Sequence, residues 1–197
     1  FTKVSQLKLN VAIQIQKYIA GGGFMFAMCS ATDSYDIALS ASGLDICAKY
    51  FDGDAADSDP DSKLDFSTTL AFKNFTLVKD PLQYEFSSID NNFNRKVIPE
   101  NDYFQLFDFS AKWDPIPTML TQNHTRTVKG FMGQTTAYKK DYIKKDVLVM
   151  GENKGLNEAK YIHGVYGKGT WTFYGGHDPE DYQHRVGDPV TDLNLHP

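Results

Sequence analysis

The apolar positions of the first twenty residues recur at helical spacing, and a continuous apolar run follows them. One helical face collects Val4, Leu7, Val11 and Ile15. This spacing predicts an amphipathic helix from about Val4 to Ala20. Glycines 21–23 favour its end, because glycine accepts the left-handed backbone of a helix C-cap. Residues 24–28 are apolar on both faces, which is typical of a strand inside a helix-covered parallel sheet.

Cys29 directly follows this predicted strand and precedes a second helical pattern that runs through Leu39. Open α/β sheets place their ligand crevice at the carboxyl ends of strands. A thiol beside a helix N-terminus lies near oriented N–H groups, which favour the nucleophilic thiolate. Residues able to cap the helix are Ser30, Thr32, Asp33 and Ser34. The alternative interpretation is a buried cysteine that packs as a small apolar side chain.

The middle of the chain changes to short, alternating segments. Strands are expected at 69–72, 75–78, 84–86, 103–107 and 127–131, with a further short strand at 44–47. An acidic loop from Asp52 to Asp65 precedes this region, and its aspartates 57, 59 and 61 match the first positions of a calcium-binding EF-hand loop. Ser62 and Thr68 stand where that loop needs glycine and glutamate, so we expect a solvated loop and no metal.

The final third returns to apolar strands at 147–151, 159–163 and 170–174. We therefore expect one α/β domain over residues 1–197, with a flavodoxin-like, doubly wound, mostly parallel sheet and a β-rich insertion at about 64–140. Such a sheet needs strands before its first helix, and none precedes Val4. The chain is thus expected to be a segment of a longer protein that lacks the first strands of the fold.

A polar cluster begins at His177, directly after the strand at 170–174. Two strand ends followed by reactive residues suggest one catalytic crevice, with Cys29 as nucleophile and His177 as its base. Glu180 or Asp178 would orient the imidazole. Predicted substrate contacts are Ser30, Trp171, Tyr174, Asp178, Tyr182 and His184. A structural alternative has Asp178 as the N-cap of a helix that opens at Pro179.

Composition and charge limit the kinds of molecule that this protein is expected to bind. A net charge of −5 over 197 residues gives no clustered basic surface for nucleic acid. No apolar run approaches the roughly 20 residues that a transmembrane helix needs. Two cysteines form neither a disulfide framework nor a zinc motif. We expect a small-molecule substrate, no cofactor and no membrane span, while protein partners stay open.

Two segments resemble a known superfamily. The runs 18–24 and 166–178, the latter reading YGKGTWTFYGGHD, resemble the class I glutamine amidotransferase-like superfamily and especially its ThuA-like branch. Segments 22–38 and 170–197 are similar to a bacterial family often labelled "asparagine synthetase B", although no synthetase motif is present. The resemblance implies a catalytic Cys29, His177 and Glu180, a longer parent chain and an export signal; the alternative location is the cytoplasm.

Two functions follow from these observations. The first is a Cys-His hydrolase, or an amidotransferase-like activity, on an amide or a related small substrate. The second is a noncatalytic module that binds a carbohydrate or another metabolite in a crevice lined by Trp171, Tyr174, His177 and Tyr182. In the family's elbow, Gly-X-Cys-X-Gly, both glycine positions are alanine here, at 27 and 31.

Overall fold

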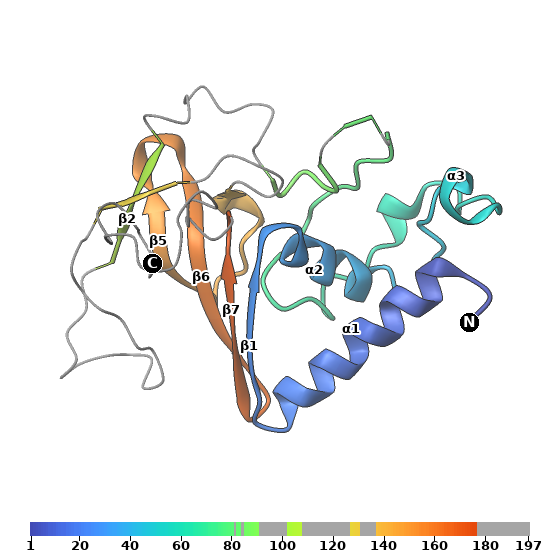
Figure 1. Cartoon of the computed structure of the whole chain (residues 1–197), viewed down its shortest axis with the longest axis horizontal. Helices are drawn as coiled ribbons and strands as arrows, with labels where there is room; N and C mark the ends of the chain where they lie inside the picture. Colours follow the sequence, from blue (N-terminus) through green and yellow to red (C-terminus); the bar gives the residue numbers. More distant parts are fainter. Residues whose placement is uncertain (81, 84, 91–101, 108–126, 131–136, 177–197) are drawn as a thin grey trace, which may run out of the picture.

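The computed structural model describes residues 1–80, 82–83, 85–90, 102–107, 127–130 and 137–176. These residues form a mixed α/β structure in which two helices pack beside an open sheet (Figure 1). The helices are α1 (Val4–Ala20), α2 (Asp33–Ser40) and the single turn α3 (Lys49–Asp52). Short 3-10 turns are η1 (Cys29–Ala31), η2 (Pro60–Lys63), η4 (Lys140–Tyr142) and η5 (Lys154–Leu156).

The described strands join in one sheet of order β1-β7-β6-β5-β2-β3, with β4 paired to β6. Their bounds are β1 (Phe24–Met28), β2 (Tyr103–Leu106), β3 (Thr127–Lys129), β4 (Tyr138–Lys139), β5 (Leu148–Asn153), β6 (Glu158–Tyr166) and β7 (Gly169–Tyr174). Strand β1 runs parallel to β7, and the other described pairs are antiparallel. The α/β class is confirmed, whereas the doubly wound, mostly parallel sheet is not.

The start of the chain has the predicted elements, but the expected cover on both faces of the first strand is wrong for the described residues, since Phe24 and Phe26 are about half exposed. Helix α1 and strand β1 have the predicted bounds, and Cys29 lies at the carboxyl end of β1. The connection turns at Gly22, whose φ of 116° requires glycine, while the C-cap residue Gly21 is right-handed. Because of this turn, β1 runs back alongside α1, and Ile19 near the end of α1 is fully buried.

Hydrophobic contacts hold α1 and α2 against one face of the sheet. Met25 and Ala27 of β1 and Trp171 and Phe173 of β7 pack there, because alternate residues of neighbouring strands share a face. The opposite face has a smaller cluster in which Tyr174 packs with Phe104, Met150 and Tyr161. Core residues thus lie on both sides of β7.

Several segments predicted as strands are irregular in the structure. Residues 44–47 form no strand, and segments 69–72 and 75–78 contribute only the isolated bridges Phe72–Ile143 and Leu77–Ser87. Residue 84 of the segment 84–86 is outside the described residues. The predictions at 103–107 and 127–131 correspond to β2 and β3, although residue 131 is not described. These strands belong to the same sheet as β5.

Aspartate side chains explain the irregular segments. Asp36 accepts the backbone N–H groups of Leu70, Ala71 and Phe72 at 2.7 to 2.8 Å. Asp61 likewise accepts the N–H of Leu77 at 2.7 Å. Backbone donors that would pair with a neighbouring strand are therefore bound by carboxylates. No helix among the described residues is long and apolar enough to cross a membrane.

Candidate functional site

Cys29 lies in a sharp turn between β1 and α2, as the sequence predicts. Its φ of 56° is left-handed, a conformation that costs a residue with a side chain about 1–2 kcal/mol. The residue is partly exposed, and its thiol forms no disulfide. A nucleophile on a strained strand-to-helix turn is the geometry of the nucleophile elbow. Ser30, a predicted substrate contact, follows in η1 and is also partly exposed.

Both backbone groups of Cys29 form hydrogen bonds. Its N–H donates to the carbonyl of Gly176 at 2.8 Å, beyond Met28 and Tyr174, the last residues paired between β1 and β7. Its carbonyl accepts from the Thr32 N–H at 3.2 Å and from the Thr32 hydroxyl at 2.8 Å. The turn is therefore held from the end of β7 on one side and from the start of α2 on the other.

Trp171 and Tyr174 lie on opposite faces of β7. Trp171 is 2% exposed and packs against Phe173 with ring centroids 4.7 Å apart, on the side of the helices. Tyr174 is also 2% exposed and lies in the second cluster, opposite Met28. Among the described residues, both aromatic rings are therefore packed in the core.

The remaining predicted site residues are outside the described part of the chain. These are His177, Asp178, Glu180, Tyr182 and His184. The described residues end at Gly176, whose carbonyl binds the Cys29 N–H. The separation between the Cys29 sulfur and the His177 ring is accordingly still a prediction.

A group of buried polar side chains beside the Cys29 turn has no clear signal in the sequence. Thr32, Asp33, Ser87, Asp90 and Tyr138 are all at most 1% exposed. The Ser87 hydroxyl lies 3.4 Å from an Asp33 oxygen. Burial raises the pKa of the Tyr138 phenol well above its usual range, the Thr32 side chain opposes this shift, and the charges of Asp33 and Asp90 add to it. These residues come from distant segments, so sequence spacing gave no means of grouping them.

A buried ion pair lies deeper in the sheet. The Lys160 Nζ of β6 is 3.0 Å from Asp102 Oδ2, and both side chains are fully buried. The Lys160 carbonyl accepts the Gly175 N–H at 2.6 Å, which links this part of β6 to the end of β7. Removing either charge would leave the other buried without its partner, so we interpret this pair as structural.

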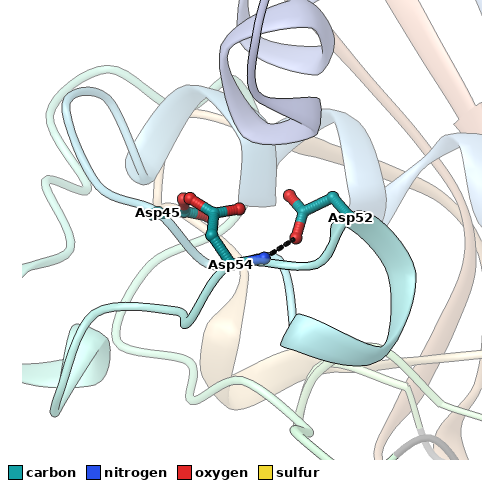
Figure 2. A group of neighbouring side chains, drawn as sticks. All are labelled: Asp45, Asp52 and Asp54. Carbon is teal, nitrogen blue, oxygen red and sulfur yellow. Dashed lines mark hydrogen bonds between the residues drawn. The ribbon is translucent and has the colours of Figure 1, made fainter.

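Asp45, Asp52 and Asp54 form a separate acidic cluster near the N-terminus (Figure 2). One carboxylate oxygen of each lies within 4.8 Å of the others, and the Asp54 N–H donates to Asp52 Oδ1 at 3.4 Å. The ammonium of Lys3 is 2.7 Å from Asp45 and 2.6 Å from Asp54. Its hydrogen bonds lower the pKa of both carboxyl groups. A lysine cation thus already neutralises part of this cluster.

The aspartates that resemble an EF-hand loop have structural contacts instead. Asp57 accepts the Asp45 N–H at 2.8 Å, and Asp61 accepts the Leu77 N–H as described above. Asp59 adopts a left-handed φ of 50° before Pro60, at the start of η2. The carboxylates of Asp57 and Asp61 therefore fix loop conformations.

An apolar cavity of about 790 Å³ opens between α1, α2 and residues 77–80, 83, 85 and 86. Val11, Ile15, Tyr35 and Leu77 line it, and Ala31 and Ser34 reach it from the Cys29 turn, but Cys29 itself does not. The second cysteine, Cys47, lines this cavity, but the predicted nucleophile Cys29 does not, so the cavity is not the site predicted from the sequence.

Comparisons of this chain with protein-family models, with curated proteins and with solved structures found no match. The residues and their geometry are therefore the basis for a functional proposal.

Proposed function

We propose that this protein is a cysteine-dependent hydrolase or amidotransferase-like enzyme that acts on an amide or a related small substrate. The observation that carries the proposal is the left-handed φ of 56° at Cys29, between strand β1 and helix α2. Strained backbone at a non-glycine residue persists only where its surroundings enforce it, and such residues concentrate at functional sites. The resemblance to the class I glutamine amidotransferase-like superfamily, ThuA-like branch, agrees with this chemistry.

In the proposed reaction the Cys29 thiolate attacks the carbonyl carbon of the amide, after His177 has accepted the thiol proton. The C–N bond breaks, and His177 returns the proton to the leaving amine. Water then hydrolyses the thioester and restores the thiol. Glu180 would hold the His177 ring, and backbone N–H groups after Cys29 would stabilise the oxyanion.

Gly176 supports the proposed pairing of Cys29 with His177. Its carbonyl binds the Cys29 N–H at 2.8 Å, and a single peptide bond joins it to His177. A flavodoxin-like arrangement with further parallel strands beside β1 belongs to the same proposal, because β1 and β7 already pair in parallel. The alternative, a noncatalytic metabolite-binding module, has less support, since Trp171 is buried in the core.

The test is alkylation of the intact chain by iodoacetamide across pH, with each cysteine followed by mass spectrometry of its own peptide. Cys47 is an internal control, because burial and the neighbouring Asp52 raise the pKa of its thiol to about 11. We expect Cys29 to react rapidly below about pH 7, where an unassisted thiol is almost fully protonated. His177→Ala should abolish this reactivity. A Cys29 that reacts as an ordinary thiol, with or without His177, would favour the binding module.

A further inference from the structure

Thr32 occupies the N-cap position of α2 but does not cap that helix. An N-cap threonine ordinarily accepts a hydrogen bond from an N–H of the first helical turn. Here the Thr32 side chain forms no such bond. Its hydroxyl points back along the chain and donates to the carbonyl of Cys29 at 2.8 Å. Thr32 is fully buried, so the donor side of this bond is shielded from water.

The bond acts on the strained residue itself. The Cys29 carbonyl also accepts the Thr32 N–H at 3.2 Å, so one residue supplies two donors to it. A hydrogen bond contributes about 0.5–1.5 kcal/mol net, which is comparable to the cost of a left-handed residue with a side chain. Together with the N–H bond to Gly176, these contacts can maintain the conformation of Cys29.

The buried Tyr138 ring packs close to the residues that hold the Cys29 backbone. The ring comes from β4 and lies over Gly175, where an added Cβ would be 3.2 Å from Tyr138 Cζ. Gly175 precedes Gly176, which binds the Cys29 N–H. The Thr32 side chain influences the ionisation of the Tyr138 hydroxyl, so the ring is near Thr32 and also near Gly175, the neighbour of Gly176.

We infer that Thr32 is a positioning residue that holds Cys29 in its left-handed conformation through the hydroxyl-to-carbonyl bond, with the buried Tyr138 ring as its support. This inference rests on the proposed function, because it assigns Thr32 a role in the reactivity of the Cys29 thiol. Loss of the hydroxyl lets the backbone of residue 29 relax and moves the thiol away from the groups that activate it.

The experiment compares Thr32→Val with a matched control, Thr69→Val. Thr69 is also buried, and its hydroxyl donates to the Phe66 carbonyl at 2.9 Å in a different part of the fold. Thermal unfolding should show similar losses of stability for the two variants. Alkylation of Cys29 at about pH 6.5 should fall about tenfold in Thr32→Val, since small displacements of a reacting group have effects of this size or larger.

Two further variants complete the test. Thr32→Ser keeps the hydroxyl and should restore the alkylation rate of Cys29 to within about twofold of the wild-type rate. A difference of that size is expected because the serine side chain is less restricted in its rotamer than threonine. Thr32→Ala removes the hydroxyl and the γ-methyl together and adds no apolar group in their place, and it replaces the valine variant if that protein does not fold. Equal Cys29 rates in the Thr32 and Thr69 variants at every pH would overturn the inference.

The outcomes separate this inference from the proposed function. If wild-type Cys29 reacts as an ordinary thiol, the proposed function fails. The role of Thr32 is then judged from the rate at about pH 10, where most of an ordinary thiol is ionised and the rate reports access and orientation. A change in that rate for Thr32→Val but not for Thr69→Val supports the positioning role, and no change overturns it.

Discussion

Cys29 illustrates how one residue can combine a chemical group with an unfavourable backbone. Its φ of 56° would suit glycine, yet the chain has a thiol there. The hydrogen bonds from Thr32 and to Gly176 offset the cost of this conformation. The strain should therefore be measurable by removing the side chain.

We expect Cys29→Gly to be more stable than Cys29→Ala by about 1 kcal/mol, because only alanine keeps the Cβ that disfavours the left-handed region. Urea unfolding of both variants measures the difference. Ala31→Gly is the control, since Ala31 lies in the same turn without a positive φ and should lose about 0.5–1 kcal/mol. A Cys29→Gly protein less stable than Cys29→Ala would contradict the left-handed assignment.

Asp36 provides a second residue-scale prediction, because it is a fully buried carboxyl group that accepts three backbone N–H groups. Burial raises its pKa to about 6, although the three N–H groups and the charge of Lys144 oppose the shift. The folded protein thus holds this proton more tightly than the unfolded chain. Its contribution to stability is complete below about pH 4 and is lost as pH rises through about 6.

Asp36→Asn removes this titration while it also weakens the three hydrogen bonds. Its cost in unfolding free energy should be largest at pH 4 and should fall by roughly 3 kcal/mol by pH 7. Urea unfolding at several pH values checks this. Asp65→Asn is the control, because hydrogen bonds from Ser67 lower the pKa of Asp65 instead of raising it. The loss of unfolding free energy in Asp65→Asn should therefore rise with pH. A pH-independent cost for Asp36→Asn would contradict the burial of an ionisable group.

At the scale of elements, the junction of α1, β1 and β7 depends on glycines. Gly169 begins β7 where a Cβ would lie 2.2 Å from the carbonyl oxygens of Gly23 and Ile19. Both contacts are with backbone, which cannot rotate away. Gly169→Ala should therefore cost at least the 1–3 kcal/mol typical of overpacking.

Gly155→Ala is a matched substitution for this prediction. Its Cβ would have ordinary contact with Asn153 Oδ1 at 3.5 Å, and Gly155 has no positive φ. This variant should be neutral or slightly more stable, by up to about 1 kcal/mol, since alanine restricts the unfolded chain. Thermal unfolding of the two variants makes the comparison. Equal melting temperatures would argue against the close approach of α1 to β7.

The elements that the sequence predicts well have local causes. Helix α1 and strands β1 and β7 follow from periodicity and apolar runs within about 20 residues, and these segments position Cys29. Segments 69–72 and 44–47 have strand-like composition, but Asp36 and Asp57 bind their amides from distant positions. The Thr32 hydroxyl bond and the burial of Tyr138 likewise depend on tertiary contacts, which spacing alone does not show.

At the scale of the whole molecule, the two faces of the sheet are packed differently near β1. Trp171 and Phe173 are covered by α1 and α2, whereas Phe24 and Phe26 of β1 are 52% and 44% exposed on the other face. Val165 of β6 is also exposed, and it lies on the same face across Thr170 from Phe24. Among the described residues, the second cluster covers only the part of this face near Tyr174.

This asymmetry predicts unequal costs for the same substitution on adjacent strands. Phe173→Ala should cost about 3–5 kcal/mol, because it leaves a cavity among fully buried side chains. Phe26→Ala removes a half-exposed ring from the opposite face and should cost about 1 kcal/mol. The two residues lie one position apart in the paired register of β1 and β7, so the local backbone is closely matched. Equal losses of unfolding free energy in urea would mean that the face bearing Phe26 is as well covered as the face under the helices. Sedimentation across a range of protein concentrations would then test whether a second copy of the chain covers it.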